Sequence, residues 1–133
     1  EQVKIQVGSV LENIADVPSV MQVKGKDLLR GIPVTRQIDH SEVARVLEKS
    51  ISSIELGILQ TLEKCPPELA GDIYGNGIHV TGGNALLRGL KERLESKVKV
   101  KVHIDPTALR SVSNGVAGVL RDHKRFRRLL VHE

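Results

Sequence analysis

The stretch GIHVTGGNALLRGL, residues 77–90, decides how the chain is expected to fold. The apolar residues Ile78 and Val80 predict a strand, and the pattern after Gly82 and Gly83 predicts a helix. Two glycines at this junction allow a tight turn, and they also let a flat group lie against the backbone without meeting a Cβ atom. Open α/β sheets bind their ligands at this end of the strands. A purely structural turn is the competing interpretation.

The rest of the second half repeats the order of strand and helix. We expect strands at 78–81 and 98–104, and helices at 84–96 and 107–122, the last one capped by Asp105 or Thr107. A strand–helix–strand crossover implies parallel strands, so this half is expected to be α/β. Two strands are too few for a stable sheet, which indicates that further strands come from upstream.

The first half has a different order, namely a short helix, a hairpin and a long helix. Residues 1–14 suit a short helix, although a strand is a competing prediction because the apolar residues also alternate. Two antiparallel strands are expected to follow around a turn at 25–27. The strongest helix is 41–64, and Asp39 with Glu42 has the spacing of a capping box just before it.

Glycine and proline predict further details of the helices. Gly57, inside the long helix, predicts close packing at that point, because glycine is otherwise unfavourable there. Pro66 and Pro67 are expected to end the helix. A shorter helix, PELAGDIY, should follow and break at the glycines of 75–77.

Composition limits the function classes. The chain has 133 residues, 40% hydrophobic and 27% charged, as in a soluble globular protein. Aromatic residues make up 2%, which counts against single-stranded nucleic-acid binding. The net charge is +4, and the basic run 121–128 is interpreted as a solvated terminus, with contact to nucleic acid or an anionic membrane as the competing interpretation. One cysteine, Cys65, excludes an intrachain disulfide and indicates a reducing compartment. Because the chain begins with Glu1, we expect a piece of a longer protein.

The sequence has no motif that predicts chemistry by this chain alone. Its histidines and its cysteine lack the spacing of metal ligands, so no metal site is expected. No nucleophile motif is present, and no catalytic residue is expected. The acidic, glycine-containing stretch 72–77 follows a helix instead of a strand, so it is interpreted as a helix stop and not as a phosphate loop.

Three segments resemble the family of the bacterial actin homologue MreB, the rod-shape-determining proteins. EQVKIQVGS (1–9) is similar to the family helix E-x-I-K-I-E-I-G-S. VKGKDLLRGIPVT (23–35) is similar to the family hairpin V-x-G-x-D/N-L-x-x-G-L-P. LEKCPPELAGDIYGNGIHVTGGNALLRGLKERL (62–94) resembles the long family segment that runs from L-E-x-T-P-P-E-L-A to T-G-G-G-A-L-L-R-G-L.

The resemblance implies the fold shared by actin, heat-shock chaperones and sugar kinases, with ATP held between two halves. The chain looks like most of the second half of this actin-like ATPase fold. Residues 1–64 would be an α+β small lobe, and residues 65–133 would be the carboxyl-terminal part of the large lobe, which is α/β.

The resemblance also implies a binding site. In the family the glycine pair is the adenosine motif, which carries over to Gly82 and Gly83. The opening helix supplies polar groups to the adenine and ribose, which carries over to Glu1 and Lys4. Asn84 departs from the family pattern, where a third glycine is usual. Related chaperones have a serine there that contacts the base, so Asn84 would either contact the base or narrow the pocket.

As function, the resemblance implies part of an ATP-dependent, filament-forming cytoskeletal protein that determines rod cell shape and is cytoplasmic and membrane-associated. Its cofactor would be ATP or ADP with Mg²⁺. The phosphate loops, the catalytic acid, the Mg²⁺ site and the membrane-inserting segment would all lie upstream of Glu1. The chain itself is therefore not expected to be an enzyme, whereas the parent protein would be a slow ATPase.

The expected partners are copies of the same protein and membrane proteins of cell elongation, and no nucleic acid. The alternative hypothesis is a truncated paralogue that acts as a protein-interaction module without binding nucleotide.

Overall fold

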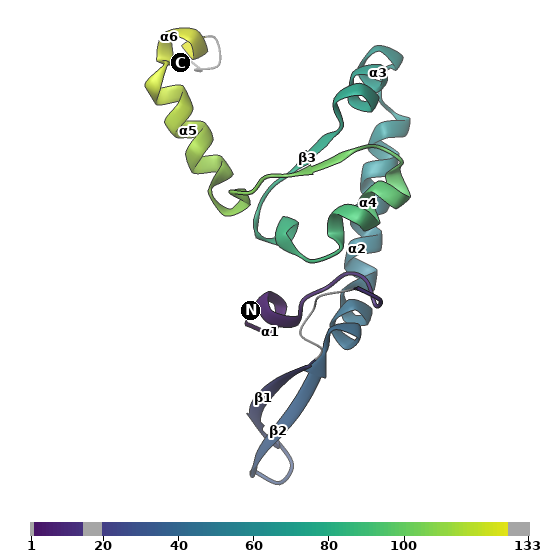
Figure 1. The fold of residues 1–133 in the computed structure, drawn as a ribbon, viewed down its shortest axis with the longest axis vertical. Helices are drawn as coiled ribbons and strands as arrows, with labels where there is room; N and C mark the ends of the chain where they lie inside the picture. Colours follow the sequence, from purple (N-terminus) through teal and green to yellow (C-terminus); the bar gives the residue numbers. More distant parts are fainter. Residues whose placement is uncertain (1, 15–19, 128–133) are drawn as a thin grey trace.

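The computed structural model describes residues 2–14 and 20–127, which form mixed helices and strands (Figure 1). In chain order the elements are α1 (Gln2–Val7), β1 (Val20–Lys26), β2 (Pro33–Asp39), α2 (His40–Glu63), α3 (Pro67–Asn76), β3 (Ile78–Val80), the 3₁₀ helix η1 (Gly83–Leu86), α4 (Leu90–Val98), β4 (Val102–Ile104), the 3₁₀ helix η2 (Ala108–Arg110), α5 (Ser111–Arg121) and α6 (His123–Phe126).

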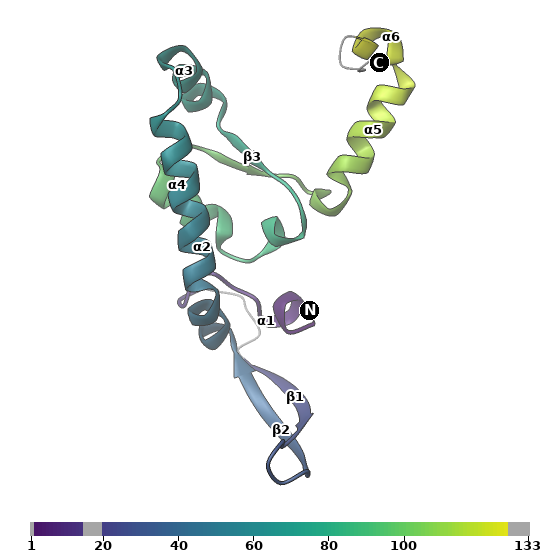
Figure 2. The same cartoon turned by 180° about the vertical axis from the view of Figure 1, so that it is seen from behind.

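The long helix α2 connects the two ends of the main body. The β1–β2 hairpin projects from one end of α2, and α3 lies at the other end (Figures 1 and 2). The short strands β3 and β4 pair beside α2 and α4, and α5 with α6 extends away from this body. In the described parts of the chain, each sheet has two strands, β1 with β2 and β3 with β4.

The first segment is helical, as predicted, but the helix is shorter than residues 1–14. α1 ends at Val7, and the strand alternative is wrong for this segment. Ser9 instead makes a parallel bridge to Arg88, and the N–H of Val10 donates to the carbonyl of Arg88 at 3.0 Å. This pairing with a distant loop replaces the helical hydrogen bonds after Val7.

The antiparallel hairpin is confirmed, but its turn is not where it was predicted. The turn occupies residues 27–32, beyond the expected 25–27, and the two strands pair as far as Lys26 and Pro33. One carboxylate oxygen of Asp27 accepts hydrogen bonds from the N–H groups of Leu29 and Arg30, at 2.8 and 2.9 Å. Asp27 therefore begins the turn and does not end it.

The start of α2 is confirmed by its cap. The carboxylate of Asp39 accepts from the backbone N–H of Glu42 at 2.8 Å, and the Glu42 carboxylate accepts from the N–H of Asp39 at 3.4 Å. The helix ends at Glu63, and Pro67 occupies the first position of α3. Close packing at Gly57 is wrong, because a Cβ atom there would meet nothing within 4 Å.

The continuous helix predicted at 84–96 is wrong, because the chain bends between η1 and α4. Leu87 is extended (φ −63°, ψ 130°), and Gly89 has φ +77°. A Cβ atom at Gly89 would lie 2.8 Å from the side chain of Leu11. The break between η1 and α4 thus depends on Gly89, because a larger residue there would collide with Leu11 from the first half of the chain.

The strand predicted at 98–104 is wrong in its first half. Val98 is the last residue of α4, and Lys99 leaves the helix in the left-handed conformation (φ 58°). Only β4 pairs with β3, in the parallel arrangement that was expected. Val98, Val100 and Val102 are all buried, so their alternation with lysines reflects burial in three local structures and not a single strand.

The last predicted helix, 107–122, divides into η2 and α5. Thr107 stands before η2 and Arg110 stands before α5, and neither helix has a side-chain cap, so the capping predicted for Asp105 or Thr107 is wrong. The Asp105 carboxylate instead accepts from the N–H of Thr107 at 2.7 Å and from the hydroxyl of Ser111. The hydrogen bond from Ser111, with a smaller contribution from Thr107, holds the pKa of Asp105 below its ordinary value.

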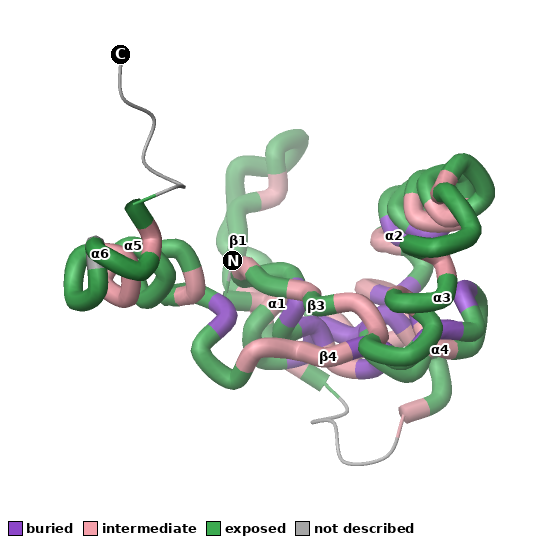
Figure 3. Tube along the Cα trace, turned by 90° about the horizontal axis from the view of Figure 1, so that it is seen from above, coloured by how far each residue is buried: buried purple, intermediate pink, exposed green. Residues whose placement is uncertain are grey.

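Buried residues gather where α2, α4 and the β3–β4 pair meet, whereas the hairpin and α5 are largely exposed (Figure 3). The core cluster consists of Val10, Ile51, Leu87, Leu90, Leu94 and Val102. Within the residues that the structure describes, none of the helices combines the length and the apolar character that a membrane span needs.

An ion-pair network ties α4 to α2 beside this core. The guanidinium of Arg93 donates to Glu55 at 2.5 Å, to both carboxylate oxygens of Glu48 at 2.6 and 2.9 Å, and to the carbonyl of Val10 at 3.1 Å. Hydrogen bonds to Glu48 and then to Glu55 raise the pKa of Arg93 above its ordinary value. The network therefore joins α4, in the second half of the chain, to α2 and to the segment around Val10, in the first half.

Candidate functional site

The glycine corner lies open at the end of β3. Gly82 has φ +88°, and a Cβ atom built on it would meet nothing within 4 Å. A Cβ atom on Gly83 would meet only the side chain of Leu109, at 3.2 Å. The N–H of Gly82 donates to the carbonyl of Ala108 at 2.9 Å, so a hydrogen bond to η2 fixes the backbone of the corner. The result is a fixed stretch of bare backbone.

Lys4 and Asn84 meet at this corner. The Lys4 ammonium donates a hydrogen bond to the side-chain oxygen of Asn84 at 3.0 Å, which links α1 to η1. Asn84 does not cap a helix, because Gly82 takes the position before η1. The contact places a positive charge and an amide next to the uncovered glycines.

A cavity of about 250 Å³ lies beside the corner. Small-molecule sites are typically about 300–1,000 Å³, so this cavity is the size of part of a site. Its lining combines Lys4, Arg88 and two glycines with apolar residues. The lining residues are Lys4, Ile5, Gly8, Gly83, Leu86, Leu87, Arg88 and Leu109.

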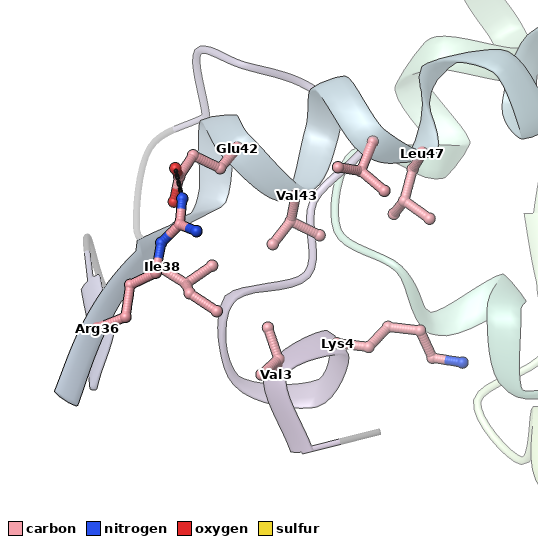
Figure 4. A pocket seen from close by; sticks show the side chains of 8 residues that line it. Val3, Lys4, Arg36, Ile38, Glu42, Val43 and Leu47 are labelled. Atoms are coloured by element: carbon pink, nitrogen blue, oxygen red, sulfur yellow. Dashed lines mark hydrogen bonds and ion pairs between the residues drawn. The ribbon is translucent and has the colours of Figure 1, made fainter. Parts of the chain in front are cut away.

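A larger cavity of about 490 Å³ lies between α1, β2 and α2 (Figure 4). Val3, Ile38 and Val43 point toward its interior, and Arg36 forms an ion pair with Glu42 at 3.2 Å at one side. Lys4 lines both cavities, and in Figure 4 its amino end points away from Val3 and Ile38. The sequence did not predict this cavity, because it arises where three separate elements meet.

Four of the five predicted site residues are brought together. Gly82, Gly83 and Asn84 form the corner, and Lys4 reaches them from α1. Glu1 lies outside the described residues. The geometry fits a nucleoside site, while nucleoside contact by these residues stays a prediction.

The sequence did not indicate two other residues of the site. The Arg88 guanidinium donates to the carbonyl of Gln6 at 2.7 Å, and Leu109 reaches Gly83 from η2. Arg88 looked like an ordinary residue of the helix predicted at 84–96. No short-range pattern signals its contact, because 82 positions separate it from Gln6.

Other chemistry-bearing residues do not assemble into a second centre. Within residues 2–14 and 20–127, no three His, Cys, Asp or Glu side chains come together as a metal site. His79 and His103 stack across the β3–β4 pair, with ring centroids 4.8 Å apart. Cys65 is a half-buried free thiol.

Comparisons with known proteins match nearly the whole chain. A family model described as MreB/Mbl protein matches residues 1–128. The cell shape-determining protein Mbl of Bacillus subtilis is 34% identical over 123 residues, which cover 92% of this chain and 36% of that protein. The cell shape-determining protein MreB of Escherichia coli is 32% identical over 115 residues, or 86% of this chain and 33% of that protein. The chain thus spans about a third of the length of these relatives.

Solved structures give the same result for the fold. MreB5 of Spiroplasma citri bound to ADP superposes with a TM-score of 0.86 at 32% identity, over 96% of this chain and 38% of that one. The same protein bound to AMPPNP gives a TM-score of 0.83 at 31% identity. The architecture is therefore part of an actin-like fold, as the sequence predicted, and the chain belongs to the MreB/Mbl protein family.

Proposed function

We propose that this chain forms the adenosine side of a nucleotide site, and a polymer-contact surface, in an ATP-dependent, filament-forming protein that determines cell shape. The names of the relatives Mbl and MreB support the role in cell shape. The ADP and AMPPNP bound to MreB5 of Spiroplasma citri support the nucleotide. The slow ATPase reaction, and the placement of the protein in the cytoplasm at the membrane, are parts of the same proposal.

The open glycine corner is the observation that carries this proposal. A nucleoside presents a flat face, and bare backbone at Gly82 and Gly83 lets such a face approach without meeting a Cβ atom. Lys4 and Asn84 stand 3.0 Å apart at the same corner, where they offer a cation and an amide to the base and the ribose. ATP would be oriented here by its adenosine part.

The phosphate end of the nucleotide would be held by residues outside this chain. The described residues contain no acidic cluster suited to Mg²⁺, and the sequence contains no phosphate loop. Mg²⁺ with bound phosphates would supply the charge stabilisation needed for phosphoryl transfer. The chain's own contribution is binding and orientation of the base and ribose.

A titration of the 133-residue chain with AMPPNP tests the nucleotide part. We expect millimolar binding, because most of the phosphate contacts are absent. In two-dimensional NMR spectra the largest amide shifts should fall at residues 82–84 and on α1. Gly83→Ala should weaken these shifts by adding a methyl group at the corner, whereas Gly71→Ala, at another exposed glycine, should leave them unchanged. Micromolar affinity, or shifts that avoid the corner, would contradict the proposal.

The polymer part concerns residues 1–64, which we propose contact the next copy of the protein. The exposed side chains of Val46 and Leu56 on α2 support an apolar contact there. The truncated interaction module remains the alternative, and a chain that shows no response to AMPPNP at any amide would favour it.

A further inference from the structure

A third cavity, of about 280 Å³, lies between α2, the end of β3, η1 and α4. It is distinct from the two cavities of the candidate site, although Lys4 lines all three. A cavity of about 150 Å³ with aliphatic and aromatic walls binds benzene, so this one has room for an apolar molecule of roughly ten to twelve non-hydrogen atoms.

The floor of this cavity, defined as its buried lining residues, is entirely apolar. Ile51 from α2 and Leu90 and Leu94 from α4 are each at most 5% exposed. Ala85 and Leu87 add to the floor from the segment that links η1 to α4. These side chains offer no hydrogen bond to water, so an apolar group is favoured against them.

The mouth of the cavity, defined as its polar lining residues, has the opposite character. Ser50, Thr81 and Asn84 are exposed, and Lys4 is half-buried. The Lys4 ammonium donates to the side-chain oxygen of Asn84 at 3.0 Å, which holds the cation at the mouth. Among the described residues that line the cavity, Lys4 carries the one positive charge and none carries a negative charge. The lining therefore suits a ligand that is apolar at one end and anionic at the other.

We propose that this cavity binds an apolar monocarboxylate of about ten to twelve non-hydrogen atoms, in the size class of a medium-chain fatty acid. The hydrocarbon part lies against the floor. The carboxylate lies at the mouth, where the charge of Lys4 attracts it and the hydroxyl groups of Ser50 and Thr81 donate to it. This inference depends neither on nucleotide binding by the glycine corner nor on contact between copies of the protein.

A neutral apolar molecule is the competing occupant, and the charge at the mouth disfavours it. A neutral molecule of the same size would gain as much from the floor but nothing from the cation. The binding of any such molecule therefore reports on the floor, whereas a preference for the anion reports on the mouth.

Titrations of the 133-residue chain with sodium octanoate and with 1-octanol, followed by NMR, test the proposal. We expect octanoate to bind with a dissociation constant below about 1 mM, and 1-octanol to bind about fivefold more weakly. Lys4→Gln should weaken octanoate about fivefold and leave 1-octanol unchanged. Lys24→Gln, which removes an exposed lysine from the hairpin, should change neither (Figure 1). Equal affinities of the wild type for the two ligands would overturn the proposal. Absence of octanoate binding, as expected if a side chain of a second copy fills the cavity, would overturn it too.

Intermolecular nuclear Overhauser effects locate the ligand. The terminal methyl group of octanoate should contact the methyl groups of Ile51 and Leu94, and the methylene next to its carboxylate should contact Thr81. Ala85→Leu fills part of the floor and should abolish binding of both ligands, whereas Ala70→Leu, in α3, should not. Contacts confined to other residues, or the inverted orientation, would contradict the proposal. The contacts in the wild type decide this even if Ala85→Leu fails to fold, and no nucleotide is present, so failure of the nucleotide site would not affect them.

Discussion

Arg93 forms an ion pair with a buried carboxylate, because the side chain of its partner Glu55 is only 7% exposed. Arg93→Met leaves the Glu55 carboxylate buried without a cation, which typically costs about 3–5 kcal/mol. We therefore expect a large fall in the free energy of unfolding, measured by urea denaturation.

An exposed ion pair provides the matched control. Arg36 pairs with Glu42 at 3.2 Å, but its side chain is 77% exposed. Pairs of this kind contribute about 1 kcal/mol or less, so Arg36→Met should have little effect. Equal losses in the two variants would show that the buried position of Glu55 does not determine the cost.

At the same scale, residue pairs close in sequence could be predicted and distant ones could not. The capping partners Asp39 and Glu42 are three positions apart, and their spacing alone indicated the bond. The contact between Lys4 and Asn84 spans 80 positions, and no local pattern records it. Both residues were nevertheless placed in one site, and this came from the family resemblance.

Among the elements, helix α2 is expected to respond to acid through its cap. The hydrogen bond from the Glu42 backbone, with a smaller contribution from the Ser41 hydroxyl, holds the pKa of Asp39 below its ordinary value. Because the folded pKa is lower than the unfolded one, ionised Asp39 stabilises the fold above the unfolded pKa. This contribution is lost as the pH falls through the folded pKa.

Substitutions at Asp39 separate the charge from the hydrogen bond. Asp39→Asn keeps a good cap but cannot lose a charge, so the loss of stability between roughly pH 5 and pH 2 should be smaller than in the wild type. Asp39→Ala should be less stable than Asp39→Asn at neutral pH as well. Urea denaturation followed by circular dichroism measures both effects. An acid profile of Asp39→Asn identical to the wild type would exclude this role.

Element boundaries failed where a distant contact decides the local conformation. The bend before α4 depends on Gly89 lying beneath Leu11, and Leu11 is far away in the sequence. The alternation of lysine and valine in 97–102 imitates a strand, although Lys99 takes a left-handed conformation that ends a helix. Parallel pairing of β3 and β4 was predictable, because the crossover rule depends on element order and not on exact boundaries.

At the scale of the whole molecule, α5 carries an exposed apolar face. Val112, Val116 and Leu120 are spaced four residues apart, so they lie on one side of this helix, and all three are exposed. α5 extends away from the body (Figures 1 and 2). We expect the chain on its own to self-associate through this face as its concentration rises, because association buries apolar surface.

Light scattering against concentration measures this association. Val112→Ser/Val116→Ser/Leu120→Ser should lower the weight-average mass toward that of a single chain. Leu69→Ser/Tyr74→Ser removes two exposed apolar side chains from α3 and should leave the mass of the assemblies near the wild-type value. If both variants lowered the mass equally, association would be a general effect of exposed apolar surface. If neither did, the unpaired edges of the two-stranded sheets would be the better explanation, because free edges can pair between chains.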